Sequence, residues 1–373
     1  MVSKSIMNKM VIANLVHRPL RSLISVSAIA LEVTLILLVV ALFYGILNGS
    51  KESQVGVGAD LMVMPPGSSA LVGMSGAPIS VKVGGVLHKV PHVTVAAPVI
   101  WWFTQKPNVE IIYGIDLASY DALSPAFRYL SGGPFQGQYD VIVDDYFAGM
   151  NRKKVGDSIE ILNHQFRICG IVPHGKGGRK FLPLATMQDL LGAEGRASAF
   201  YVKLDDPANA DQVEKEIQQV PGMENYAVRS MQEYLSMMTP DNLPGFEISI
   251  RIVIGVAVIV GFLVIFQSMY TAVMERTREI GILKSLGASK LYIVNVVLRE
   301  TAVLAILGIV AGVIISLVTR RVIMFERPVL RLFWSNQWVL RASLIAIVGA
   351  LAGALYPAFK AAGKDPIEAL AYE

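Results

Sequence analysis

Few side chains in this sequence have the types and spacing of a reactive site. His88 and His92 lie four residues apart, the spacing of two metal ligands on one helical face, but Pro91 disfavours a helix there. The sequence near them offers no Cys, Asp or Glu to complete a metal shell. Gly175-Lys176-Gly177-Gly178 has the composition of a phosphate-binding loop without the order GxxxxGK[ST]. We therefore expect no catalytic residue, no metal site and no cofactor bound by this chain.

Two further features each allow a reactive and a structural interpretation. The single cysteine, Cys169, lies in an alternating run from Phe166 to Ile171, which favours a buried strand residue over a reactive thiol. Trp101-Trp102-Phe103 could hold a lipid or a drug. Packing in a core or at an interface is favoured, because alternation along one strand would bury part of this run. Neither feature indicates an enzyme.

The distribution of hydrophobic residues indicates a membrane protein. Of the 373 residues, 53% are hydrophobic and 17% are charged, against about 25% charged residues in a typical soluble domain. This composition excludes a disordered chain and a nucleic-acid-binding domain over most of the length. A helix needs ~20 apolar residues to cross a ~30 Å hydrocarbon core. Four runs meet that length, at residues 22–47, 248–270, 291–319 and 339–359.

The long segment between the first two runs has a different composition. Residues 51–247 hold 16 basic and 21 acidic side chains, which leaves 17 basic and 8 acidic side chains for the rest of the chain. Short β-like runs broken by Gly and Pro, and an amphipathic helix at 208–220, predict a mixed α and β domain in two lobes. Residues 67–85 are rich in Gly, Ser and Pro and predict a mobile loop. The predicted strands cover residues 61–64, 93–97, 110–115, 141–143, 158–162, 165–171 and 199–204.

Basic residues indicate the orientation in the membrane. Four spans place both termini on one side. If that side is cytoplasmic, ten basic residues of the short segments lie inside and five arginines of the short outer loop lie outside, which favours this orientation. The outer arginines either meet anionic headgroups or snorkel at the interface; they are Arg320, Arg321, Arg327, Arg331 and Arg341. The first apolar run is longer than the ~7–15 residues of a signal peptide, so we expect an uncleaved anchor.

Several motifs, in order along the chain, resemble those of the FtsX-like, MacB-type ABC transporter permeases (type VII). Residues 275–289 read ERTREIGILKSLGAS, similar to the ER-x-REIG-x-LK-x-LGAS stretch of that family. Arg299 and Glu300 precede a glycine-containing helix, as in the family's third span. Residues 356–370 resemble the family's YPA…AA…DPIEAL ending, and residues 13–23 its amphipathic first helix. The resemblance covers nearly the whole chain and is weakest at residues 71–131.

The resemblance implies that the segment after the second span couples the permease to an ATPase. Ile280, Leu283 and Leu286 recur at helical spacing and predict one apolar face, and Gly287-Ala288 predicts the helix end. The same residues could form an ordinary interfacial helix with its basic side chains towards headgroups, and the resemblance favours the coupling role. The predicted coupling residues are Glu275, Arg276, Arg278, Glu279, Ile280, Leu283, Lys284, Leu286 and Gly287.

Small and charged residues within the spans predict helix packing. Gly308-x₃-Gly312 and Gly349-x₃-Gly353 allow close helix approach, either within the chain or between two copies. Glu32 and Arg299 lie roughly 12–15 Å from the cytoplasmic face at 1.5 Å per residue. A charge there is costly, so we expect Glu32 to contact Arg299 or backbone; a proton relay is the less favoured alternative.

These inferences together predict a fold class. We expect an α-helical membrane protein with four transmembrane helices and a mixed α+β extracytoplasmic domain inserted between helices 1 and 2. The segments are an amphipathic cytoplasmic helix (1–21), the first span (22–47), the extracytoplasmic MacB-like domain (48–247), the second span (248–270), the coupling segment (271–290), the third span (291–319), an outer loop (320–338), the fourth span (339–359) and a cytoplasmic tail (360–373).

The resemblance also implies a function and partners. It predicts a permease of the bacterial inner membrane whose extracytoplasmic domain moves when a separate cytoplasmic ABC ATPase, which binds ATP and Mg, hydrolyses ATP. The substrate would be hydrophobic or amphipathic: a lipid, lipoprotein, peptide or drug. Expected partners are that ATPase, a second permease copy in a 2:2 complex, a periplasmic membrane-fusion adaptor and membrane lipids, with no nucleic acid. An FtsX-type signal transmitter that activates a cell-wall hydrolase is the alternative, and a receptor without an ATPase is a third.

Overall fold

The computed structural model describes residues 19–66, 79–104, 110–239, 242, 245–326 and 330–363. The predicted N-terminal helix (1–21) and the C-terminal tail (360–373) lie mostly outside these residues. The chain forms two compact units. One unit comprises Met1–Ile46 and Pro244–Glu373, and the other comprises Leu47–Leu243.

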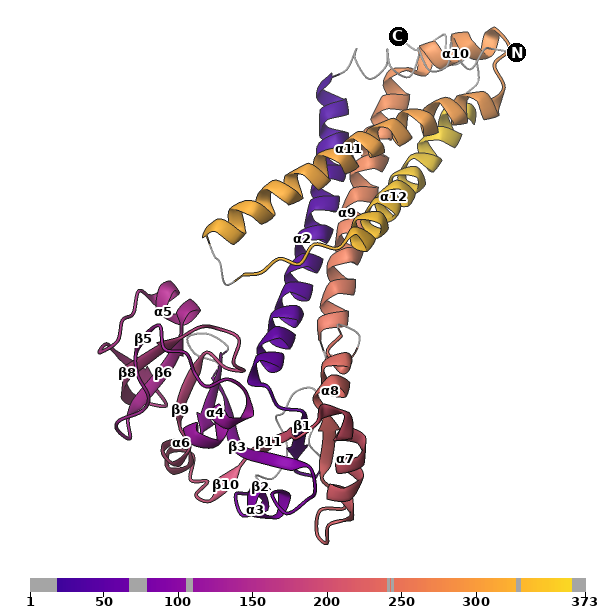
Figure 1. The fold of residues 1–373 in the computed structure, drawn as a ribbon. Helices are drawn as coiled ribbons and strands as arrows, with labels where there is room; N and C mark the ends of the chain where they lie inside the picture. Colours follow the sequence, from indigo (N-terminus) through magenta and orange to yellow (C-terminus); the bar gives the residue numbers. More distant parts are fainter. Residues whose placement is uncertain are drawn as a thin grey trace. The chain divides into compact units, whose positions relative to one another are not determined.

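Four long helices pack together in the first unit (Figure 1). Each is long and apolar enough to cross a membrane, and a helix suits that setting because it satisfies its own backbone hydrogen bonds. Buried residues from all four helices, such as Ile36, Ile265, Ala305 and Ala346, meet in one apolar core. The helices are α2 (Pro19–Val57), α9 (Phe246–Glu275), α11 (Lys290–Glu326) and α12 (Asn336–Gly363).

Glycines of α11 let this helix lie directly against α2. A Cβ added at Gly308 would lie 2.6 Å from the Ile29 Cβ, and one added at Gly312 would lie 2.7 Å from the Ala30 carbonyl oxygen. The Thr34 hydroxyl donates a hydrogen bond to the Gly312 carbonyl at 3.1 Å. The predicted packing role of Gly308-x₃-Gly312 is therefore realised within one chain, between α2 and α11.

The second glycine pair behaves differently. A Cβ at Gly353 would lie 2.9 Å from the Phe262 carbonyl oxygen, so Gly353 permits contact between α12 and α9. A Cβ at Gly349 would meet no atom within 4 Å. Within the described residues, Gly349 is thus not required for close packing.

Helix α2 continues past the predicted end of the first span at residue 47. Asn48-Gly49-Ser50 does not break it, and its last turns belong to the second unit. There Gln54 accepts a hydrogen bond from the Tyr201 hydroxyl at 2.9 Å and donates one to the Tyr113 hydroxyl at 3.2 Å. Gly58, at φ +83°, follows the helix, and this conformation suits glycine. Side-chain anchoring to the domain core therefore outweighs the turn-forming composition of residues 48–50.

A ten-stranded mixed sheet forms the centre of the second unit. Its order is β12-β1-β11-β3-β4-β9-β6-β8-β5, with β7 paired to β8. The pairs β4–β9 and β6–β8 are parallel and the others are antiparallel. A small separate pair joins β2 (Ile79–Ser80) and β10 (Arg196–Ala197). The strands of the main sheet are β1 (Leu61–Met64), β3 (Val93–Thr104), β4 (Glu110–Ile115), β5 (Ser131–Gly132), β6 (Asp140–Asp144), β7 (Ser158–Ile161), β8 (His164–Val172), β9 (Lys180–Pro183), β11 (Ala199–Leu204) and β12 (Ala227–Ser230).

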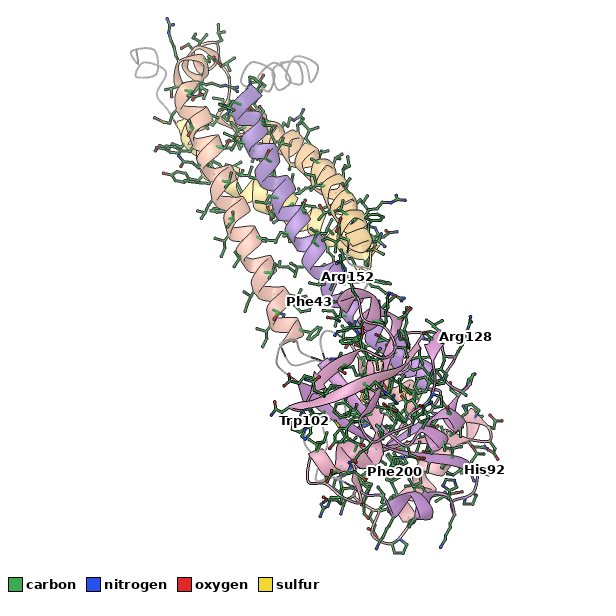
Figure 2. The ribbon with its side chains drawn as sticks, turned by 90° about the vertical axis from the view of Figure 1, so that its left-hand side faces the viewer. Phe43, His92, Trp102, Arg128, Arg152 and Phe200 are labelled. Carbon is green, nitrogen blue, oxygen red and sulfur yellow. The ribbon has the colours of Figure 1, made fainter. Side chains whose placement is uncertain are left out.

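Both faces of this sheet are covered. Met62 and Met64 of β1 join one core, whereas Leu61 and Val63 join another, so the strand is buried along its length. Figure 2 labels Phe200, which is fully buried, and Trp102, which is 40% exposed. The covering helices are α3 (Val83–Leu87), α4 (Leu117–Leu123), α5 (Asp145–Asn151), α6 (Leu184–Leu190), α7 (Ala210–Gln219, after the 3₁₀ turn Pro207–Asn209) and α8 (Met231–Met237).

The predicted strands appear, with some corrections. Those at 61–64, 110–115 and 199–204 have the bounds of β1, β4 and β11. The strand at 93–97 is longer than predicted, and β9 and β12 were not predicted because each is short and adjoins a helix. Residues 79–80 and 83–87 form β2 and α3 rather than the end of a loop, and residues 67–78 lie outside the described residues. The domain predicted to have two lobes contains one continuous ten-stranded sheet.

The residues first considered for chemistry have structural roles. Cys169 is buried, and burial raises the pKa of its thiol to about 12, so it stays protonated. The His92 ring pairs with Asp205 at 2.9 Å, which raises its pKa. The Lys176 ammonium donates to the Ser124 hydroxyl at 2.6 Å and to the Pro125 carbonyl. Trp101 packs on Tyr113 and Tyr201. No group of three metal-binding side chains occurs among the residues that the structure describes.

The expected fold class is confirmed. Four apolar helices flank a mixed α and β domain, which is inserted between the first and the second of them. The domain is bounded at Leu47 and Leu243, against the predicted 48 and 247.

The glycine contacts predict that Gly308→Ala destabilises the helical unit. The new methyl group would overlap Ile29, and overpacking of this kind costs about 1–3 kcal/mol. Gly349→Ala is the matched control, because its Cβ has free space and alanine favours a helix by about 0.5–1 kcal/mol. Thermal unfolding of the full chain in detergent should give a lower midpoint for Gly308→Ala and an equal or higher midpoint for Gly349→Ala. Equal midpoints for the two variants would contradict the packing described here.

Candidate functional site

The predicted coupling segment forms a short separate helix, α10 (Thr277–Ser285). Helix α9 ends at Glu275, and Arg276 has a non-helical backbone conformation between the two helices. At its other end, the Gly287 amide donates to the Lys284 carbonyl and the Ala288 amide donates to the Leu283 carbonyl, both at 3.0 Å. These two bonds, with Gly287 at φ +92°, form a Schellman motif. The predicted helix end at Gly287-Ala288 is confirmed.

One side of α10 packs against the ends of the long helices. Ile280 lies in a small apolar cluster with Val273 of α9, Ile293 of α11 and Ala358 and Ala361 of α12. The Lys284 ammonium donates to the Ala362 carbonyl at 3.1 Å, where a cation stabilises the C-terminal end of α12. Helix α10 is therefore attached to three of the four long helices.

The predicted apolar face of α10 requires correction. Ile280 is buried and Leu283 is half-buried, but Leu286 is 80% exposed and Ile282 is 45% exposed. Leu286 is the C-cap residue, where the chain turns away from the helix axis, so helical spacing no longer sets its direction. The exposed side of α10 carries Arg278 and Glu279 as well as these two apolar side chains.

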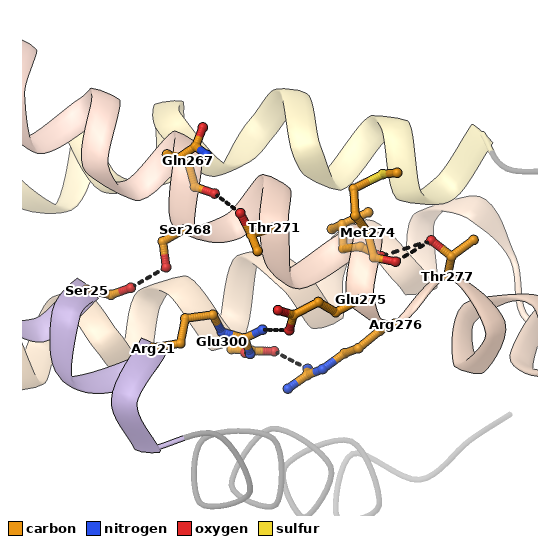
Figure 3. Close-up of polar contacts among 11 residues, drawn as sticks. Arg21, Ser25, Gln267, Ser268, Thr271, Met274, Glu275, Arg276, Thr277 and Glu300 are labelled. Atoms are coloured by element: carbon orange, nitrogen blue, oxygen red, sulfur yellow. Dashed lines mark hydrogen bonds and ion pairs between the residues drawn. The ribbon is translucent and has the colours of Figure 1, made fainter. Parts of the chain in front are cut away.

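A group of ion pairs joins α2, α9 and α11 beside α10 (Figure 3). The Glu300 carboxylate of α11 is 4% exposed and pairs with Arg276 at 3.1 Å and with Arg21 at 3.5 Å. Arg21 of α2 also pairs with Glu275 at 3.4 Å. One turn along α2, the Ser25 and Ser268 hydroxyls form a hydrogen bond at 2.6 Å. We call Arg21, Glu275, Arg276 and Glu300 the charged cluster.

The charged cluster borders a pocket between α9, α10 and α11. The pocket is small and partly open to solvent. Apolar side chains form most of its wall, including Met269, Ile280, Leu283 and Tyr292, and Arg276, Glu279 and Glu300 add charge. Movement of α10 would change this pocket and the ion pairs together.

The predicted contact between Glu32 and Arg299 is not formed. The Arg299 side chain donates to Asn295 of its own helix at 3.2 Å. The Glu32 carboxylate lies against α9, where a Cβ at Gly261 would be 2.0 Å from its Oε2, and its Oε1 has no hydrogen-bond partner among the described residues. The residue that points from α11 towards α2 is Glu300, which follows Arg299 and so lies about 100° around the helix.

Sequence reasoning therefore missed the centre of the site. In the sequence, Arg21 is only one of the ten basic residues of the short inner segments, and Glu300 is only part of a motif. One signal was present, because Glu300 precedes the apolar run beginning at Thr301, and an acid at such a boundary requires a partner. The identity of the partner depends on the arrangement of three helices, which spacing along one helix does not give. The predicted sequence match at residues 364–370 lies outside the described residues.

The charged cluster predicts a large effect of Glu300→Gln on stability. Removal of the carboxylate leaves two arginines with low exposure and less compensating charge, at a cost of about 2–5 kcal/mol. Glu326→Gln makes the same change at an exposed position of the same helix and should cost less than about 0.5 kcal/mol. Denaturant unfolding of the full chain in detergent measures both. If the two variants unfold at the same denaturant concentration, the cluster does not stabilise the bundle.

Family models match both parts of the chain. The MacB-like periplasmic core domain matches residues 22–220, and the FtsX-like permease C-terminal region matches residues 251–366. The second match contains α10 and three members of the charged cluster.

Individual proteins are similar over part of their length. An uncharacterised ABC transporter permease of Methanocaldococcus jannaschii is 26% identical over 58% of this chain and 57% of its own length. The macrolide export ATP-binding/permease protein MacB of Bdellovibrio bacteriovorus is 27% identical over 60% of this chain and 36% of its own. The chain thus spans little more than half, or less, of these relatives. The solved periplasmic region of MacB from Actinobacillus actinomycetemcomitans has a TM-score of 0.38 and 15% identity over 51% of this chain and 97% of that one.

The MacB-like core domain alone matches more than half of the chain, and the FtsX-like region follows it in the expected order. The chain belongs to the family of FtsX-like, MacB-like ABC transporter permeases.

Proposed function

We propose that this permease transmits force from a separate ABC ATPase, through α10, to its α and β domain. The composition of the exposed side of α10 supports this role. It presents Ile282, Leu286, Arg278 and Glu279, a mixture of apolar and charged side chains suited to a protein partner. The opposite side is held by Ile280 and Lys284.

The attachment of α10 suits it to move several helices together. Arg276, directly before α10, pairs with Glu300 of α11, and Glu300 also pairs with Arg21 of α2. A displacement of α10 would therefore pull on α2 and α11 through these ion pairs, and on α9 through the chain connection between α9 and α10. Because α2 and α9 are the helices that enter and leave the α and β domain, their movement would reach that domain.

In this proposal, α10 and both termini are cytoplasmic and the α and β domain is extracytoplasmic. Basic residues at the α10 end of the bundle support the orientation. The described ones are Arg21, Arg276, Arg278, Lys284, Lys290 and Lys360. ATP and Mg would bind to the ATPase.

The proposed activity is export or extraction of a hydrophobic or amphipathic substrate. Similarity to proteins named as macrolide exporters supports this class. We further propose two permease copies with two ATPases, and a periplasmic adaptor that receives the substrate. Purification of the native complex tests these partners: an ATPase with an adaptor supports export, an ATPase with a cell-wall hydrolase supports signal transmission, and no ATPase contradicts the proposal.

The proposal predicts that Leu286→Asp lowers substrate-stimulated or basal ATPase activity of the complex at least about tenfold. A buried apolar contact with the ATPase, replaced by a charge, would cost about 1.5–3 kcal/mol. Because Leu286 is 80% exposed in the chain, its own folding should change little. Co-purification of the ATPase and its rate of ATP hydrolysis are the measurements.

Leu130→Asp is the matched control. Leu130 is also an exposed leucine, at 52%, but lies in the α and β domain. The Leu130→Asp variant should leave the rate of ATP hydrolysis unchanged. Normal hydrolysis and ATPase retention in Leu286→Asp would contradict a coupling role for the exposed side of α10.

A further inference from the structure

The connection between α11 and α12 contains an arginine-rich surface that the coupling role does not use. Residues 319–341 contain five arginines, no lysine and one acid, Glu326. This connection lies at the end of α11 opposite to α10. The described arginines are Arg320, Arg321, Arg331 and Arg341, and we call them the arginine surface.

These arginines lie at the depth of lipid headgroups. The apolar run of α11 from Thr301 to Val318 has a length of about 27 Å at 1.5 Å per residue, close to the hydrocarbon thickness. Arg320 and Arg321 follow its last residue almost directly. Arg341 directly precedes the apolar run of α12. Both helices therefore place arginine at the same boundary of the hydrocarbon layer.

The backbone that carries this surface is held in place. The extended segment 330–335 crosses α2, where the Phe333 amide donates to the Ala41 carbonyl at 2.9 Å. It passes so close to Gly45 that a Cβ there would overlap the Arg331 carbonyl. Arg320 Nε donates to the Leu332 carbonyl at 3.0 Å, which ties the end of α11 to this segment. The backbone at Arg331 is thus held against α2 and against the end of α11.

Aromatic and apolar side chains at the same level indicate a lipid environment. The Arg341 guanidinium lies 5.1 Å from the Trp338 ring centroid, and Trp338 packs against Tyr44 of α2. Phe325 and Leu340 are 85% and 72% exposed. Tryptophan and tyrosine beside exposed apolar residues are typical of the membrane interface. A small soluble anion would leave these apolar side chains in water.

The basic residues of this connection are all arginines, which favours phosphate binding over side chains that merely snorkel to the membrane interface. A lysine reaches the interface as readily as an arginine, whereas the planar guanidinium binds a phosphate through two parallel hydrogen bonds. At the α10 end of the bundle the chain uses both residue types, as at Arg278 and Lys284. Basic residues in an outer loop also oppose the positive-inside rule, so the rule does not account for them.

We propose that the arginine surface binds the phosphate headgroup of an anionic phospholipid, in the membrane leaflet at the end of the helical unit opposite to α10. Arg321 and Arg341 are exposed and supply the guanidinium groups, while Arg320 holds the loop. The acyl chains lie against exposed apolar side chains on the hydrocarbon side of these arginines, such as Val318 of α11 and Leu344 of α12. This lipid contact is independent of ATP hydrolysis.

Tryptophan quenching by brominated lipids tests the proposal on the full chain. Reconstituted protein is compared in mixtures of brominated phosphatidylglycerol and brominated phosphatidylcholine. The relative association constant is fitted to the part of the total tryptophan emission that the lipids quench, which we assign to Trp334 and Trp338 because Trp101 and Trp102 lie in the α and β domain. We expect phosphatidylglycerol to be favoured by about fivefold or more, because each arginine near anionic lipid contributes roughly a fivefold effect. The ratio of the two association constants is unaffected by changes in the intrinsic fluorescence of the protein. Excess inorganic phosphate should not abolish the preference; complete displacement would indicate a soluble anion instead and overturn the proposal.

The variant Arg321→Gln/Arg341→Gln should reduce the ratio to about one. The matched control, Arg128→Gln/Arg196→Gln, removes two exposed arginines from the α and β domain and should leave it unchanged. Arg321→Lys/Arg341→Lys, which keeps the charge and the fold, should give an intermediate ratio. Equal quenching by both lipids in the wild-type protein overturns the proposal without any variant, as does an unchanged ratio in a correctly folded glutamine variant.

Discussion

The position of Glu300 constrains the whole helical unit. A carboxylate with 4% exposure at the start of an apolar run is tolerated only with cationic partners, and its two partners come from different helices. Arg21 fixes the depth of α2, and Arg276 fixes the point at which α9 gives way to α10. Because each arginine must reach one carboxylate, the three helices cannot slide independently. The chain turns at Arg276, so that α10 packs across the ends of the long helices rather than continuing along the axis of α9.

Close contacts between the helices also restrict their relative movement along the rest of the helical unit. Gly308 and Gly312 bring α11 against α2, and Gly353 brings α12 against α9. Such contacts leave little room for side-chain adjustment, since tightly packed interfaces change between discrete arrangements rather than deforming gradually. A displacement at α10 would therefore be passed on by whole helices.

The general fold followed from composition and periodicity, whereas the site did not. Apolar runs and alternating strands indicate the four helices and the mixed domain because each depends on residues close in sequence. The end of α2 at Val57 depends on the distant hydroxyl groups of Tyr113 and Tyr201. The strands β9 and β12 depend on pairing with β4 and β6 and with β1, respectively. Likewise, Arg299 and Glu300 are neighbours in sequence, and only the crossing of α11 with α2 decides which of them faces inward. The motif at residues 275–289 predicted the position of α10 in the chain, but it did not predict that Leu286 is exposed.

The two ends of the helical unit use arginine in different ways, and the difference follows from the acids available. Beside α10, the chain supplies Glu275 and Glu300 for Arg21 and Arg276, so the charges of this cluster are balanced internally and its residues are held within the protein. Between α11 and α12, one acid accompanies five arginines, so this segment carries a net positive charge. An internal ion pair fixes one helix against another, whereas a surface that takes its anion from the bilayer fixes the helices against the membrane. In the proposed mechanism, a helical unit that is pushed at α10 needs such a fixed point at its other end, because without it the push would shift the whole unit instead of tilting its helices.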